Sequence, residues 1–380
     1  MQQSKASQDQ RIAVFGESGS GKTVLLSSFY GATQEPDYLR ESLFNIVADD
    51  QGQGRRLHQN YLGMRNSARR PAATRFSATT YSFSLLPRNG NAKAKKNQPF
   101  DKLRLVWHDY PGEWFEDGVS GPEEAQRRVR TFRDLLGSDV ALLLVDGQRL
   151  LDNAGEEERY LKSLLSNLRN GLLPLKDELL PDGKPLVKFP RIWVLALSKA
   201  DLLPNMNVFE FRDLLIEKVG EDIEELRRAI AGFVENSDAL SVGDDYMLLS
   251  SARFGTDKIE VTNRVGLDLI LPLATMLPLE RYARWVEAMH DRGKVAEYLL
   301  SGAGTLAGVL VGLNLKGRIG SLLNSFGPGL IDAAELVGEK LKEVNDKARA
   351  KHEDMKAILT GFKIDLDQGE EERVFLRSRR

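Results

Sequence analysis

A glycine-rich segment near the start of the chain has the residue types and the spacing needed to hold phosphate groups. Residues 16–23 read GESGSGKT, which fits the pattern G-x-x-x-x-G-K-[ST]. The glycines allow positive φ angles and close backbone approach, so that successive N–H groups point at one anion. Lys22 adds a positive charge for the β- and γ-phosphates, and Thr23 offers Mg²⁺ a hydroxyl ligand. The predicted phosphate site consists of Gly16, Glu17, Ser18, Gly19, Ser20, Gly21, Lys22, Thr23 and Val24.

A second segment, residues 198–201, reads SKAD and follows an apolar run. It resembles the guanine-specificity motif of GTPases, [N/T]-K-x-D. The carboxylate of Asp201 can accept hydrogen bonds from N1–H and the 2-amino group of guanine, an arrangement that adenine does not present. The stem of Lys199 can lie along the plane of the base. Ser198 departs from the motif, and an ordinary strand-to-helix turn is the alternative interpretation.

Three further segments are similar to GTPase motifs. An apolar run ends in D-x-x-G, where Asp109 would hold Mg²⁺ through water and the N–H of Gly112 would contact the γ-phosphate. Thr74 precedes a predicted strand and is the candidate switch I ligand of Mg²⁺, with Thr79 and Thr80 as alternatives. The loop predicted to pack on guanine contains Ser251, Ala252 and Arg253.

The order of these motifs along the chain resembles that of the Ras-like and translation-factor GTPases of the TRAFAC class, over about residues 11–255. Within that class the chain looks similar to the double-GTPase families associated with bacterial conflict systems. The resemblance implies a protein that binds GTP, GDP and Mg²⁺, hydrolyses GTP and acts as a nucleotide-controlled switch. An ATP-using P-loop enzyme and a non-hydrolysing, nucleotide-dependent assembly protein are the alternatives.

Catalysis by such a protein would depend on positioning and electrostatics. Glu113 stands where Ras-like proteins place a glutamine, and a carboxylate so close to the γ-phosphate predicts slow turnover without a partner. A solvated charge on the switch loop is the alternative interpretation of Glu113. Arg69 and Arg70 are interpreted as solvated basic residues, with an arginine finger in cis as the alternative. His108 is expected to pack or to form a local hydrogen bond. The candidate catalytic residues are Lys22, Thr74, Gly112 and Glu113.

The elements that must position these residues alternate between short apolar runs and longer helical patterns. This alternation predicts an α/β, P-loop NTPase fold with a mostly parallel sheet flanked by helices. Strands are predicted at 11–15, 79–85, 103–108, 140–145, 192–197 and 246–249, and helices at 23–30, 156–170, 208–219 and 223–236. The predicted organisation is a disordered tail (1–10), a GTPase domain (11–262) with a switch I insertion (34–73) that has a helix near 54–62, and a helical C-terminal region (263–380).

The C-terminal region is predicted to contain no strand, to form an amphipathic helix over 331–360 and to end in a loose segment, 370–380. Residues 298–315 are uncharged, with Gly304, Gly308 and Gly312 at four-residue spacing. That spacing permits close helix packing. Because the stretch is short for a membrane span and diluted by small and polar residues, a buried helix is favoured over membrane association.

Composition narrows the range of partners. The 380 residues carry a formal net charge of −2, so no global field would recruit nucleic acid. The chain has no cysteine, which fits a cytoplasmic protein and excludes thiolate chemistry. The expected partners are a guanine nucleotide and either another protein or a second copy of the chain, bound through the switch segments or the C-terminal helices.

Overall fold

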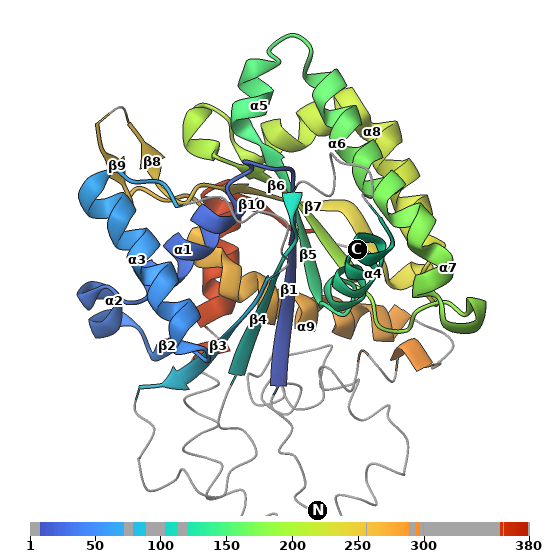
Figure 1. Cartoon of the computed structure of the whole chain (residues 1–380), viewed down its shortest axis with the longest axis horizontal. Helices are drawn as coiled ribbons and strands as arrows, with labels where there is room; N and C mark the ends of the chain where they lie inside the picture. Colours follow the sequence, from blue (N-terminus) through green and yellow to red (C-terminus); the bar gives the residue numbers. More distant parts are fainter. Residues whose placement is uncertain are drawn as a thin grey trace, which may run out of the picture.

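The fold is built on one sheet, flanked by helices (Figure 1). The computed structural model describes residues 8–71, 79–88, 103–112, 121–255, 257–288, 294–296, 299, 358–359 and 361–378. The eight-stranded sheet has the order β10-β7-β6-β5-β1-β4-β3-β2. Its central strands are parallel: β1 (Gln8–Phe15), β4 (Leu103–Asp109), β5 (Val140–Asp146), β6 (Ile192–Ser198) and β7 (Ser241–Leu249). The antiparallel strands are β2 (Phe44–Ala48), β3 (Thr79–Pro87) and β10 (Phe375–Leu376). The predicted α/β fold with a mostly parallel sheet is confirmed.

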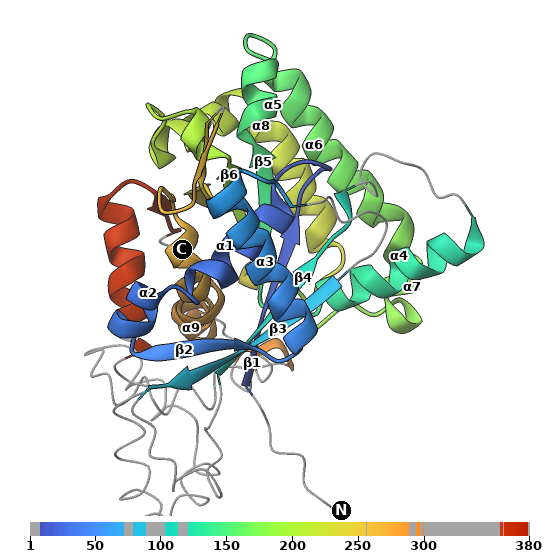
Figure 2. The same ribbon diagram turned by 60° about the vertical axis from the view of Figure 1, so that its left-hand side comes forward.

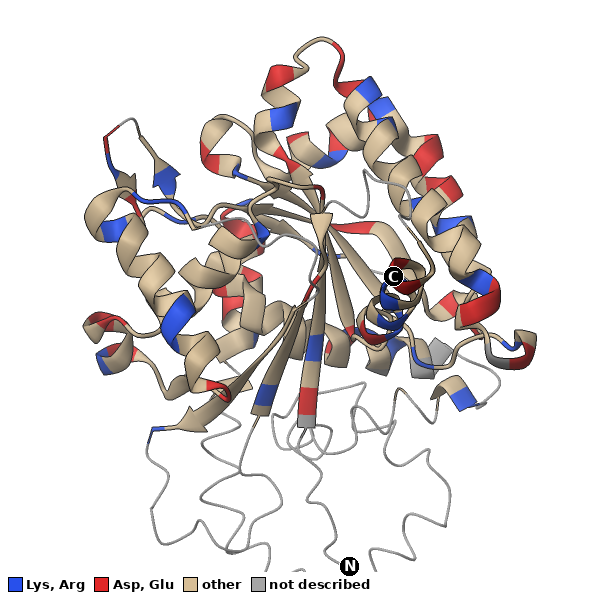
Figure 3. Ribbon diagram, in the orientation of Figure 1, with Lys and Arg blue, Asp and Glu red and all other residues tan. Residues whose placement is uncertain are grey.

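Helices cover both faces of the sheet because the central strands are apolar on both sides. One face is covered by α4 (Pro122–Leu135), α6 (Glu157–Leu172) and α8 (Val208–Ala231). The other is covered by α1 (Lys22–Ala32), α3 (Gln51–Ser67) and α9 (Ile270–Ala288). The shorter elements are α2 (Pro36–Glu41), α5 (Gly147–Asp152), α7 (Lys176–Leu179), β8 (Arg253–Phe254) and β9 (Ile259–Glu260). Charged residues gather on the helices and largely avoid the sheet (Figure 3).

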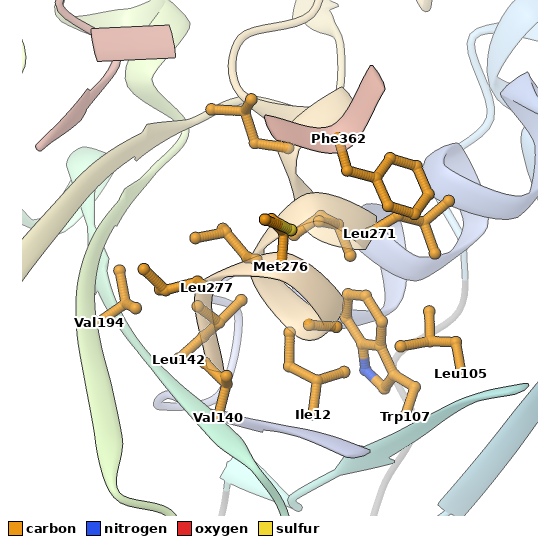
Figure 4. Packing of buried hydrophobic residues seen from close by; sticks show 14 of the residues in the cluster. Ile12, Leu105, Trp107, Val140, Leu142, Val194, Leu271, Met276, Leu277 and Phe362 are labelled. Atoms are coloured by element: carbon orange, nitrogen blue, oxygen red, sulfur yellow. The ribbon is translucent and has the colours of Figure 1, made fainter. Parts of the chain in front are cut away.

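The strands send alternate side chains to two cores. In β1, Ile12 and Val14 face the core that contains α1 and α9, whereas Ala13 and Phe15 face the core that contains α6 and α8. Figure 4 shows the first of these cores, where Trp107 and its neighbours on the strands pack against side chains from α9, and Phe362 lies beside Leu271 of that helix.

The insertion between residues 34 and 73 contains α2, β2 and α3. The helix predicted near 54–62 is confirmed as part of α3, which begins after Asp50 accepts hydrogen bonds from the N–H groups of Gly52 and Gln53. The sequence did not predict β2, an edge strand that pairs with β3. Helices α1 and α3 approach closely, since an ideal Cβ on Gly31 would lie 2.1 Å from Cγ of Tyr61.

Several predicted boundaries are wrong. β1 begins at Gln8, so the last residues of the predicted tail belong to the sheet. The two helices predicted at 208–219 and 223–236 lie within α8, which has a kink at Val219 (φ −143°), where the first was predicted to end. The second ends at Ala231, five residues earlier than predicted. Helix α4 was not predicted, because it contains few apolar residues among its arginines and glutamates.

The expectation that no strand follows residue 263 is wrong. β10 pairs with β7, and the helical residues 361–371 lie beside α2, where Phe362 meets Phe44 with ring centroids 5.6 Å apart (Figure 2). Phe375 is fully buried, so residues 370–378 are not a loose tail. The division of the chain at residue 262 stays a prediction, and the hydrophobic core runs across it.

Some predictions fall outside the described residues. These are Thr74, Glu113, the glycine face of 298–315 and almost all of the helix at 331–360. Among the helices that the structure does describe, none combines the length and the apolar character needed to cross a membrane.

Candidate functional site

The phosphate loop connects the buried strand β1 to the first turn of α1. Gly19 and Gly21 have φ angles of 80° and 92°, which side-chain-bearing residues rarely adopt. Lys22 is buried, and its Nζ donates hydrogen bonds to the carbonyl oxygens of Gly16 (2.6 Å) and Glu17 (3.0 Å). The loop therefore curls around the lysine ammonium group, and the first turn of α1 adds its N–H groups and its positive dipole end.

The SKAD segment lies where β6 ends, beside the end of β5. Ser198 is buried, and its Oγ donates a hydrogen bond to the carbonyl oxygen of Val145 (3.2 Å), so the serine ties the segment to β5. Lys199 has a left-handed backbone (φ 54°), and its Nζ lies 2.7 Å from Oδ2 of Asp146. Ser250, at the end of β7, donates a hydrogen bond from Oγ to Oδ1 of Asp201 (2.7 Å).

These loops enclose a cavity of about 320 Å³. Its wall combines the phosphate loop with the two segments predicted to recognise guanine. The lining residues named in the sequence analysis are Gly19, Ser20, Gly21, Val24, Arg70, Ser198, Lys199, Asp201, Ser251 and Ala252. A cavity of this size, with polar groups converging on apolar walls, is typical of a small-molecule site. Tertiary structure thus brings together residues that lie up to about 230 positions apart in the chain.

The D-x-x-G segment lies against the other side of the phosphate loop. Asp109 ends β4 beside Val14 of β1, and it is buried. An ideal Cβ on Gly112 would lie 2.3 Å from the backbone nitrogen of Ser18, so only glycine fits at this position. Asp109 lies two residues after Trp107 in β4, so both side chains are on the same face of the sheet, the face that α1 covers. Thr23, in the first turn of α1, is therefore on the same side of the sheet as Asp109.

The three candidate switch threonines are not equivalent. Thr79 pairs with Asp109 in the β3–β4 ladder, so both side chains lie on the face of the sheet that α1 covers. Thr80 points to the opposite face, where its Oγ1 lies 3.1 Å from Nδ1 of His108. Burial lowers the pKa of His108 to about 4, so this histidine is neutral near pH 7. The local hydrogen bond expected for His108 is present.

Two residues near this cavity differ from what the sequence indicated. Arg70, interpreted as a solvated residue, also lines the cavity, and Arg253, predicted to belong to the guanine loop, does not. Arg70 is exposed and lines the cavity, with its guanidinium carbon 5.4 Å from the ring centroid of Phe254. Arg253 is exposed and does not line this cavity, whereas its neighbour Phe254 does. Phe254 was not predicted, because an aromatic residue five positions beyond the end of β7 matches no motif.

Three further residues were missed. Ser250 precedes the expected S-A pair, and unlike Ser251 it is buried and donates a hydrogen bond to Asp201. Asp146 ends β5, and a carboxylate at the carboxyl end of an apolar run was a signal that could have been used. Arg149, on α5, forms an ion pair with Glu17 (2.8 Å) that joins residues 132 positions apart in the chain.

A family comparison covers most of this site. The sequence model of the Double-GTPase 2 family matches residues 10–231, which is more than half of the chain. The matched region contains the phosphate loop, the D-x-x-G segment and the SKAD segment, and it ends before Ser250. The resemblance to double-GTPase families that the sequence indicated is confirmed. No curated protein matches the chain.

Proposed function

The chain belongs to the Double-GTPase 2 family, and from this premise we propose that it binds GTP and GDP with Mg²⁺, hydrolyses GTP to GDP and phosphate, and acts as a nucleotide-controlled switch. The observation that carries the proposal is the cavity that joins Gly19, Ser20 and Gly21 to Asp201 and to the loop after β7. A phosphate loop and a carboxylate fit for guanine thus line the same space.

Asp201 is the residue that would select guanine. Its Oδ1 accepts a hydrogen bond from Ser250, which is itself buried and whose Oγ also lies 3.0 Å from the carbonyl oxygen of Ala252. A carboxylate held in this way is already oriented before the base arrives, so less conformational entropy is lost on binding. Its remaining lone pairs would accept hydrogen bonds from N1–H and the 2-amino group of guanine.

Lys22 and the loop amides would hold the phosphates. The carbonyl oxygens of Gly16 and Glu17 now accept from Lys22, and phosphate oxygens are stronger acceptors for the same ammonium group. The N–H groups of residues 19–23 would surround the β-phosphate, and α1 would direct its positive end at the same anion.

Mg²⁺ would be held by Thr23, Asp109 and a switch threonine, for which Thr74 remains our candidate. The donor set fits this ion, since hydroxyl and carboxylate oxygens are its usual protein ligands, and Thr23 and Asp109 share one face of the sheet. When bound, Mg²⁺ would neutralise phosphate charge. Gly112 would offer its N–H to the γ-phosphate, and Glu113 would orient the attacking water.

The test is a nucleotide panel measured by calorimetry with Mg²⁺, for wild type and Asp201→Asn. Wild type should prefer GTP over ATP, and Asp201→Asn should shift the preference toward XTP, since xanthine has a carbonyl where guanine has its 2-amino group. Charge-assisted hydrogen bonds contribute about 1.5–3 kcal/mol each, so the ratio of GTP to XTP affinity should change at least about tenfold. Asp238→Asn, an exposed change, is the control.

Two outcomes would contradict the proposal. Preference for ATP in wild type would favour an ATP-using enzyme and remove the guanine assignment. Tight GTP binding with no release of phosphate in a single-turnover assay would favour a nucleotide-dependent assembly protein. For the switch role, hydrogen exchange of residues 34–75 and of the segment after Gly112 should be slower with a non-hydrolysable GTP analogue than with GDP.

A further inference from the structure

The short helix α5 connects the two ends of the candidate nucleotide site. Asp146 caps the N-terminus of α5, where its side chain accepts a hydrogen bond from the N–H of Gln148 (2.9 Å). It also forms an ion pair with Lys199 of the SKAD segment (2.7 Å). One turn later, Arg149 reaches the phosphate loop. Its Nη1 lies 2.8 Å from Oε2 of Glu17, and its Nη2 donates a hydrogen bond to the carbonyl oxygen of Ser18 (3.4 Å).

Glu17 is an unusual neighbour for a polyphosphate. Its side chain is only 4% exposed, while that of Arg149 is 36% exposed. A buried carboxylate is costly unless a cation and hydrogen bonds compensate its charge. Within the phosphate loop there is a second cost, because an uncompensated negative charge would repel the nucleotide, and the repulsion grows with the number of phosphate charges.

The peptide unit between Glu17 and Ser18 is also where other parts of the site meet. The carbonyl oxygen of Glu17 accepts a hydrogen bond from Lys22 (3.0 Å). The Cα of Gly112 packs so closely on this peptide that an ideal Cβ there would lie 2.5 Å from the carbonyl carbon of Glu17. Displacement of this peptide unit would therefore move both the lysine and the D-x-x-G segment.

We infer that Arg149 is a positioning residue of the nucleotide site: it neutralises Glu17 and holds the carbonyl oxygen of Ser18, in the peptide unit that follows the Glu17–Ser18 peptide, so that the loop accepts a triphosphate. The inference rests on the proposed function and adds a residue on α5 to that site. Arg149 acts through Glu17 and Ser18, and it is assigned no contact with the substrate. The negative charge of Glu17 is what makes the arginine necessary.

The inference predicts a specific pattern in a double-mutant cycle. Arg149→Met keeps much of the side-chain volume but removes the charge, so it should lower GTP affinity about tenfold or more. GDP affinity should fall less, because GDP carries less charge. Glu17→Gln is measured by itself as the second single variant. In the double variant Glu17→Gln/Arg149→Met, GTP affinity should lie within about threefold of that of Glu17→Gln, because the charge that Arg149 compensates is then absent.

The measurements are calorimetric affinities for GTP and GDP with Mg²⁺, together with melting temperatures without nucleotide. The control is Arg159→Met, which removes an exposed arginine that pairs with Glu156 at the start of α6. It should change neither affinity by more than about twofold. Because Arg149 is partly exposed, its replacement should leave the protein folded.

Two results would overturn the inference. One is a double variant that binds GTP as weakly as Arg149→Met, since Glu17 would then not be the cause of the loss. The other is an equal loss of GTP and GDP affinity with a lowered melting temperature, which would make the pair merely structural. Wild-type preference for ATP would refute the guanine assignment alone, and the same cycle would then be measured with ATP and ADP. A wild-type protein that binds no nucleotide would overturn both proposals.

Discussion

Gly112 packs so tightly on the phosphate loop that no side chain fits between them. An ideal Cβ at this position would lie 2.3 Å from the amide nitrogen of Ser18 and 2.5 Å from the carbonyl carbon of Glu17. Both are backbone atoms of the Glu17–Ser18 peptide, whose carbonyl oxygen accepts a hydrogen bond from Lys22, and Arg149 donates to the next carbonyl oxygen, that of Ser18. They therefore cannot yield as a flexible side chain would. We therefore predict that Gly112→Ala forces the D-x-x-G segment away from the phosphate loop.

The cost of that displacement can be placed within limits. Overpacking of this kind costs about 1–3 kcal/mol, which corresponds to roughly a 5- to 150-fold change in an equilibrium. If the D-x-x-G segment moves away, the closed arrangement, in which it contacts the phosphate loop, becomes rarer by that factor. GTP hydrolysis should then slow by the same factor, while the free energy of unfolding hardly changes. If the segment stays, the same free energy appears as a loss in the free energy of unfolding.

Two assays together distinguish these cases. Single-turnover GTP hydrolysis with Mg²⁺ reports the closed arrangement, and urea denaturation without nucleotide reports the free energy of unfolding. Gly121→Ala is the matched control, because an ideal Cβ at Gly121 would meet no atom within 4 Å. Wild-type values in both assays for Gly112→Ala would refute the close contact between the two segments.

Three further predictions concern the phosphate site, the C-terminal segment and pH. Lys22→Ala should weaken nucleotide binding about tenfold or more, measured by calorimetry on folded protein, because it removes charge-assisted hydrogen bonds; unchanged affinity would exclude a phosphate-binding role for the loop. Phe375→Ala should lower the free energy of unfolding by about 3–5 kcal/mol, because the ring is fully buried, whereas Ile364→Ala, at a side chain 58% exposed, should change it little; equal effects in urea denaturation would mean that the C-terminal segment is not part of the core. Burial raises the pKa of Asp139 from 3.8 to about 6, so its ionisation destabilises the folded state as the pH rises through that interval. Asp139→Asn should therefore stabilise the protein by about 1–2 kcal/mol near pH 7.5 and hardly at all near pH 4; the same gain at both pH values would contradict this reasoning.

Much of the candidate nucleotide site could be predicted from the sequence because its elements are local. The phosphate loop depends on glycines at fixed positions between an apolar run and a helical pattern, and Gly19 and Gly21 adopt the positive φ angles expected there. The SKAD and D-x-x-G segments follow β6 and β4 directly. Because parallel strands present their carboxyl ends at one edge of the sheet, motifs that end such strands are brought together by the fold class alone.

Interactions between distant residues could not be predicted in this way. The first half of β7 contains Gly243, Asp244 and Asp245, which read as a turn rather than a buried strand. Asp245 accepts a hydrogen bond from its neighbour Ser241 (2.8 Å), but it also depends on two distant partners: Arg281 of α9 lies 2.7 Å away, and the N–H of Ser378 donates to it (2.9 Å). Both partners come from segments far along the chain, and without them the buried carboxylate would be prohibitively costly.

The sequence by itself determined the phosphate loop, the guanine-type segment and the mostly parallel sheet, because each depends on residue types at short, fixed spacing. Only the tertiary structure decided that Ser250 holds Asp201, that Arg149 compensates Glu17, and that the end of the chain returns to the sheet as β10. The physical reason is that a buried polar group needs a partner, and any suitably placed residue can supply it regardless of its position in the sequence. Spacing along the chain therefore identifies the groups that need partners, and only folding selects the partners.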